Sequence, residues 1–143
     1  MDLVSPSAIL TSRAGLAAVE AAVAKGVKLG RRVNAAVVDP GGNLVAFLRC
    51  EGAPLLSASI ARDKAFTSAS FGLSTAGWEP VVQGNEALRA GLQARERLVM
   101  FAGGLPIVID GQLVAGIGVS GASDQEDEAC ARAGLNALGL DDG

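Results

Sequence analysis

Residues 33–48 read VNAAVVDPGGNLVAFL, and they give the clearest indication of how the chain folds. Two apolar runs, 33–38 and 44–48, flank the segment Asp39-Pro40-Gly41-Gly42-Asn43, in which every residue favours a turn. The pattern predicts a β-hairpin. A second hairpin is predicted where the apolar runs 106–109 and 113–119 flank the turn residues 110–112. We therefore expect antiparallel strand pairs at the centre of the fold.

Helical patterns surround the two hairpins. Apolar residues recur at three- and four-residue steps between Thr11 and Leu29, which predicts a helix with Thr11 as its N-cap. Three further helices are predicted, over 55–71, 85–96 and 129–138. Residues 72–80 read as a loop, and 98–101 as a further strand. This order predicts a single α+β domain over residues 1–143, with helices flanking an antiparallel sheet.

The composition excludes several kinds of chemistry. Of 143 residues, 50% are hydrophobic, which is enough for a packed core, but the chain has no His and no Tyr. Without His there is no Ser-His-Asp or Cys-His nucleophile system and no two-His zinc site. The net charge of −3 and an aromatic content of 3% argue against a nucleic-acid partner, because phosphate binding needs a concentrated basic surface.

The cysteines and the N-terminus indicate the compartment. Cys50 and Cys130 stand in neither a C-x-x-C nor a metal-ligand spacing, so we expect reduced, buried thiols. The start Met1-Asp2-Leu3 lacks the basic residues of a signal peptide. No apolar stretch is long enough to span a membrane. We therefore expect a cytoplasmic protein with no membrane partner.

Four segments in series carry a resemblance to a known family: Val37–Leu44, Ala61–Ala69, Gly103–Ile107, and Gly116–Gly121 followed by Glu126-Asp127. They resemble the GlcG/HbpS proteins. This family is also called the haem-degrading domain family and includes the C-terminal domain of some corrinoid adenosyltransferases. The resemblance implies a profilin- or PAS-like sheet of five antiparallel strands flanked by helices, usually in a homo-oligomer, and haem as a possible ligand.

The predicted helix 55–71 carries three candidate ligand-binding residues, Arg62, Lys64 and Thr67. At 100° per residue, Lys64 and Thr67 share a side of the helix, whereas Arg62 points well away from Lys64. A cationic Lys64 beside Thr67 would hold a carboxylate, either a haem propionate or a small organic acid. The alternative is a solvated lysine and a threonine packed against its own helix.

Three further positions are candidates for ligand binding, each with a structural alternative. Gly103-Gly104 permits close backbone approach, and its amides would bind an oxyanion, although a tight connection between strands needs the same glycines. Ser120 precedes the last helix, where its hydroxyl would bind a ligand or, as the pattern favours, cap the helix. Trp78, the only Trp, would close over a flat ligand or pin a loop or oligomer contact.

The candidate catalytic residues are Asp63, Glu126 and Asp127, since carboxylates are the only ordinary general bases in the chain. Complementation of the helix dipole explains the last two equally well. They sustain one hypothesis, a cofactor-independent isomerase, lyase or hydrolase acting on a small organic acid. In it Lys64 or Arg62 would be the electrostatic clamp.

The leading hypothesis is a homo-oligomeric binding protein for haem or a similar planar or carboxylate-bearing metabolite. Its pocket would lie between the helix 62–67, the glycines Gly103-Gly104 and the loop at Ser120. With neither His nor Tyr, a haem iron would need Thr, Lys, Cys or Met. Met100 is the one credible thioether, although its apolar neighbours favour a place in the core. A third possibility is an assembly or chaperone-like accessory without a ligand.

Overall fold

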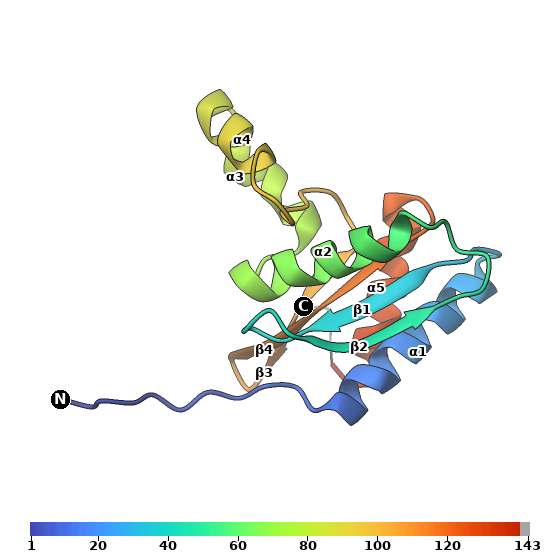
Figure 1. Ribbon diagram of the computed structural model, residues 1–143, viewed down its shortest axis with the longest axis horizontal. Coiled ribbons are helices and arrows are strands. Elements are labelled where there is room, and N and C mark those ends of the chain that lie inside the picture. Colours follow the sequence, from blue (N-terminus) through green and yellow to red (C-terminus); the bar gives the residue numbers. More distant parts are fainter. Residues whose placement is uncertain (141–143) are drawn as a thin grey trace.

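The computed structural model describes residues 1–140, in which four antiparallel strands form one sheet with helices on both faces (Figure 1). The spatial order of the strands is β2-β1-β4-β3, so each hairpin supplies one central and one edge strand. The two hairpins meet where β1 pairs with β4, with Asn34 opposite Ser120. The strands are β1 (Asn34–Val38), β2 (Leu44–Arg49), β3 (Gly104–Ile109) and β4 (Gln112–Ser120).

The helices divide between the two faces of the sheet (Figure 1). α1 and α5 pack together on one face, where Ala35 and Val37 of β1 join the main core. α2 covers the other face and meets the alternate residues of β1, Ala36 and Val38. The helical elements are α1 (Ser12–Lys28), α2 (Ser57–Phe71), the 3₁₀ turn η1 (Thr75–Trp78), α3 (Glu79–Val82), α4 (Glu86–Gln93) and α5 (Asp124–Ala137).

Local sequence signals explain several element ends. The Thr11 hydroxyl accepts a hydrogen bond from the Ala14 N–H at 3.2 Å, so the predicted N-cap of α1 is confirmed. Both predicted hairpins form. The acidic run lies inside the first turn of α5, and the predicted loop 72–80 contains η1 and the start of α3. Together α3 and α4 form an arm that projects from the sheet (Figure 1).

The prediction of five strands is wrong, because the sheet has four strands within residues 1–140; the α+β class is right. Residues 98–101, expected as a strand, join no ladder. The Val99 N–H donates instead to the Thr67 hydroxyl at 3.0 Å. β3 therefore stays an edge strand, and Pro106 within it lacks the N–H that a further strand would need.

α2 lies directly against the backbone of β4 because Gly116 and Gly118 present no side chain to it. A Cβ atom at Gly116 would collide with the backbone of Ala65, and one at Gly118 with the backbone of Ala61 and Ala65. Small residues on α2 also allow this contact, since Ala61 and Ala65 are fully buried against β4. The Gly-x-Gly pair thus allows two backbones to approach, which is one of the uses of glycine within strands.

Among residues 1–140, no helix combines the length and apolar character that a bilayer crossing requires.

Gly118→Ala should strongly destabilise the protein, because its methyl group would displace α2 from the sheet. Forced displacement in a packed core costs about 1–3 kcal/mol or more, and a backbone collision belongs at the upper end. Gly91→Ala is the matched control, since a Cβ there meets open space on α4. It should leave the free energy of unfolding unchanged or slightly higher. Urea unfolding of both variants measures the difference in stability. Equal stabilities would contradict the close packing of α2 against Gly118.

Candidate functional site

Two of the predicted site residues, Lys64 and Asp127, form a buried ion pair. Lys64 Nζ lies 3.1 Å from Asp127 Oδ2 and donates to the Val119 carbonyl at 2.8 Å. Asp127 Oδ1 accepts the Ala122 N–H at 3.0 Å. The two residues are 1% and 3% exposed. The pair ties α2, the end of β4 and the first turn of α5 together.

Burial perturbs both members of this pair. It lowers the pKa of Lys64 and raises the pKa of Asp127, and each charge partly offsets the effect on the other. A carboxyl group with a raised pKa beside a cation is what a catalytic base would require. Here both side chains are closed off from solvent, so a substrate does not reach them. Lys64 and Asp127 therefore have a structural role, which is to hold α2, β4 and α5 together.

The two glycines at 103 and 104 pack against Lys64. A Cβ at Gly103 would collide with Lys64 Nζ and the Val119 carbonyl, and one at Gly104 with the Lys64 carbonyl. The Gly104 N–H donates to the Thr75 hydroxyl at 2.8 Å, so it is not free for an oxyanion. The pocket expected between these glycines and α2 is filled by the Lys64 side chain.

Ser120 is the last residue of β4 and does not cap α5, which corrects the prediction. Ser123 is the N-cap: its hydroxyl accepts the Glu126 N–H, and the Glu126 carboxylate accepts the Ser123 N–H. The Arg31 guanidinium also binds Glu126, at 3.1 Å. These bonds lower the pKa of Glu126 and identify it as a capping residue.

Trp78 is buried rather than poised over a ligand. Its ring meets Phe71 edge to face, with centroids 4.7 Å apart. The indole Nε1–H has no hydrogen-bond partner among residues 1–140. Trp78 therefore anchors the base of the α3–α4 arm to the end of α2.

Thr67 holds the segment that follows α4. Its hydroxyl donates to the Arg97 carbonyl at 2.8 Å and accepts the Val99 N–H at 3.0 Å. Arg97, whose carbonyl accepts the first of these bonds, has a φ of +67°, which is uncommon for a residue other than glycine. The buried Thr67 side chain thus holds the backbone of residues 97–99 against α2.

Arg97 lies across the aromatic face of α2. The guanidinium carbon is 3.8 Å from the centroid of Phe66, and Nε is 3.1 Å from Asp63 Oδ1. Asp63, a predicted base, is therefore an ion-pair partner of Arg97. Arg62, on the same helix, is exposed, as expected from its angle to Lys64.

A cavity of about 260 Å³ opens beside this Arg97–Phe66 stack. Its walls combine aromatic and aliphatic side chains with two guanidinium groups and one carboxylate. Arg95 has no side-chain hydrogen bond or ion pair with any residue of the range 1–140. The lining residues are Phe66, Thr67, Ser70, Phe71, Leu92, Arg95, Glu96, Arg97 and Leu98.

Of the predicted ligand-binding residues, Thr67 alone lines this cavity. Sequence reasoning missed Arg95 and Arg97, because it placed the first inside a helix and left the second unassigned. α4 ends at Gln93, so the charged run 95–97 folds back toward α2. A charged run between Leu92 and Leu98 is the sequence signal that marks this turn.

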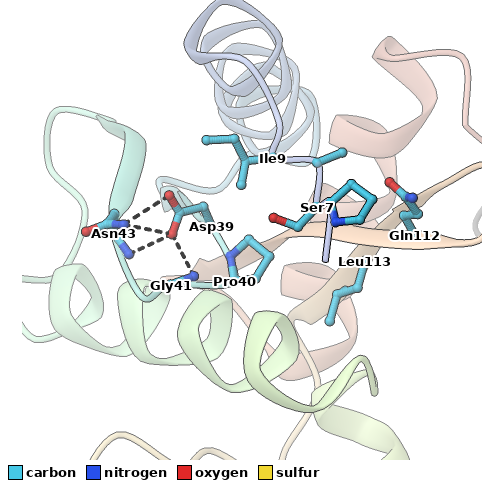
Figure 2. Close-up of a pocket in the computed structure, with 10 residues that line it drawn as sticks. Ser7, Ile9, Asp39, Pro40, Gly41, Asn43, Gln112 and Leu113 are labelled. Atoms are coloured by element: carbon cyan, nitrogen blue, oxygen red, sulfur yellow. Dashed lines mark hydrogen bonds between the residues drawn. The ribbon is translucent and has the colours of Figure 1, made fainter. Parts of the chain in front are cut away.

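A second pocket, of about 640 Å³, lies between the N-terminal segment and the two hairpin turns (Figure 2). Asp39 lies in its wall, but Oδ1 accepts the N–H groups of Gly41 and Asn43, and both oxygens accept the Asn43 amide. These bonds lower the pKa of Asp39. The lining contains no Lys or Arg, so it suits a carboxylate ligand less well.

The structure offers little for a metal. Within residues 1–140, no group of three or more Cys, Asp or Glu side chains is arranged to hold an ion. Cys50 and Cys130 are free and buried, as predicted. Burial raises the pKa of Cys130 to about 11, so it remains a thiol.

Comparison with known proteins gives consistent matches. A family model described as "Haem degrading protein HbpS-like" matches residues 10–136. Protein GlcG of Escherichia coli K12 is 32% identical over 112 residues, which cover 78% of this chain and 81% of GlcG.

Two solved structures are also similar. A double mutant of Streptomyces reticuli HbpS has a TM-score of 0.86 and 38% identity, over 94% of this chain and 90% of that one. A PduOC–haem complex has a TM-score of 0.81 and 30% identity, over 90% of this chain and 94% of that one.

Lys64→Met should destabilise the protein by about 3–5 kcal/mol, because it leaves the Asp127 carboxylate buried without its cation. The double variant Lys64→Met/Asp127→Leu should recover most of this loss, since no charge then remains buried. Urea unfolding measures both.

Arg89→Met serves as the control for this pair, because it breaks the exposed ion pair with Glu79 and should change stability little. A Lys64→Met protein as stable as the wild type would contradict the structural task of the buried pair.

Proposed function

The chain belongs to the HbpS-like family of haem-degrading proteins, and from that premise we propose that it binds a planar or carboxylate-bearing small molecule. Haem is one candidate, because a similar structure was solved as a haem complex. The observation that carries the proposal is the cavity between α2 and residues 92–98, which joins apolar walls to guanidinium groups.

The cavity suits a flat acid for two reasons. Phe66, Phe71, Leu92 and Leu98 provide the apolar surface that covers a ring, as in most small-molecule sites. Arginine binds carboxylates through paired N–H donors, which supplies orientation as well as affinity. The guanidinium of Arg95 is the group available for this contact.

Iron coordination does not fit the residues present. Haem iron is ordinarily held by His, Cys, Met or Tyr, and none of these lines the cavity. The Thr67 hydroxyl already makes two hydrogen bonds, and Lys64 is committed to Asp127. The proposed binding therefore relies on contacts with the ring and the carboxylate of the ligand, and it includes no coordination of a metal.

We further propose that the protein is a homo-oligomer in the cytoplasm, accessory to a catabolic pathway. Large apolar side chains stay exposed on α1, where Leu16 is 49% and Val27 60% exposed. Such side chains, with Val81 and Phe101, offer surface for a second copy. The free cysteines agree with a reducing compartment.

Light scattering coupled to size exclusion should give the mass of two or more chains of 14.3 kDa each. A purely monomeric protein at micromolar concentration would contradict the oligomer. This outcome would leave ligand binding untouched, because every lining residue of the cavity comes from one chain.

Titration with haem, followed by Soret absorbance, and with metal-free protoporphyrin IX, followed by quenching of Trp78, tests the binding function. Trp78 reports on the cavity because its ring contacts Phe71 in the cavity wall. At least one of the two should bind saturably. Similar affinities are expected for both if the metal contributes nothing.

The variant Arg95→Gln should bind either tetrapyrrole about tenfold more weakly, which corresponds to about 1.4 kcal/mol for a lost charged contact. Arg62→Gln, on the exposed side of α2, should bind as the wild type does. If neither tetrapyrrole nor any small carboxylic acid binds, the proposed function fails.

A further inference from the structure

We propose that the cavity beside α2 selects a small monocarboxylic acid with one apolar ring or a short branched chain, in preference to a tetrapyrrole. This inference rests on the proposed function, because it assumes that the cavity between α2 and residues 92–98 is the binding site. It goes beyond that function by assigning the size and charge of the ligand.

The size of the cavity sets the first limit. Its volume is about 260 Å³. An apolar cavity of about 150 Å³ is enough to hold a benzene molecule, whereas pockets for drug-sized ligands begin at about 300 Å³. The space beside Phe66 and Leu92 therefore matches one ring with a short substituent, and a complete macrocycle would remain largely outside it.

The charges set the second limit. Arg97 is already paired with Asp63, so Arg95 is the cation without a partner among the lining residues. One unpaired guanidinium matches one carboxylate. Glu96 also lines the cavity and would repel a second acidic group on the ligand. The arrangement selects a monoanion over a dianion.

Arg97 acts as a positioning residue in this site. The Thr67 hydroxyl binds its carbonyl and the Val99 N–H, and Arg97 itself adopts a left-handed conformation that is uncommon for a residue other than glycine. Its guanidinium carbon lies 3.8 Å from the centroid of the Phe66 ring. The stacked pair forms a preset wall, so a ligand ring meets a surface that needs no rearrangement.

Phenylacetate and isovalerate are suitable probes, and phenylacetamide and isovaleramide are their neutral counterparts of similar shape. Isothermal titration and Trp78 fluorescence measure binding of each. The wild type should bind each acid at least about tenfold more tightly than its amide, as one added charged contact predicts. Succinate, a dianion, should bind more weakly than either acid.

Two variants test which residues of the cavity contact the ligand. In Arg95→Gln the advantage of acid over amide should disappear, while the affinity for the amides stays. Ser70→Leu, which places a side chain into the cavity from the exposed end of α2, should weaken acids and amides alike. Arg62→Gln, on the same helix outside the cavity, should retain wild-type affinities. Circular dichroism confirms that each variant is folded.

The outcomes separate this inference from the function on which it rests. Saturable binding of haem or protoporphyrin without binding of the acids overturns the inference and leaves the function standing. Acid binding that is unaffected by both Arg95→Gln and Ser70→Leu also overturns it, because the ligand would then lie elsewhere. Acid binding that is lost as described, with weaker tetrapyrrole binding, supports it.

Discussion

The close contact between α2 and β4 determines how Lys64 is buried and where the candidate cavity lies. It exists because Gly116 and Gly118 present only hydrogen atoms to the backbone of Ala61 and Ala65. A helix held this near the sheet has little room for side chains along its inner face. Lys64, on that face, is therefore enclosed completely, and its charge has to be compensated inside the protein.

The position of α2 also determines the candidate site. Asp127 compensates Lys64 and thereby fixes the start of α5, while Thr67, one turn further along α2, binds the returning chain at Arg97 and Val99. The first contact closes the end of the sheet near Gly103 and fills the space expected for a ligand. The second brings residues 95–99 beside α2, where Thr67 lines the cavity. Of the two residues expected to bind a ligand from one side of this helix, Thr67 lines the candidate site and Lys64 is enclosed.

The sequence was sufficient for the local elements and insufficient for contacts between distant residues. Turn residues 39–43 and the Thr11 cap act on their immediate neighbours, so both could be predicted. Nothing in the sequence pairs Lys64 with Asp127, since burial of a lysine depends on glycines far along the chain. Residues 98–101 have a strand-like composition, but a hydrogen bond to Thr67 replaces the ladder. The left-handed Arg97 has no local signal, and this is why its place in the site was missed.

The most direct test of a carboxylate site beside α2 is chemical-shift mapping of the labelled protein during titration with phenylacetate. The indole N–H of Trp78 is a convenient reporter, because Trp78 is the only Trp and contacts Phe71 in the cavity wall. We expect the largest shifts at Ser70, Leu92 and Arg95, with a smaller shift of the Trp78 indole. Shifts confined to the pocket at Asp39, or no shifts at saturating ligand, would contradict the account.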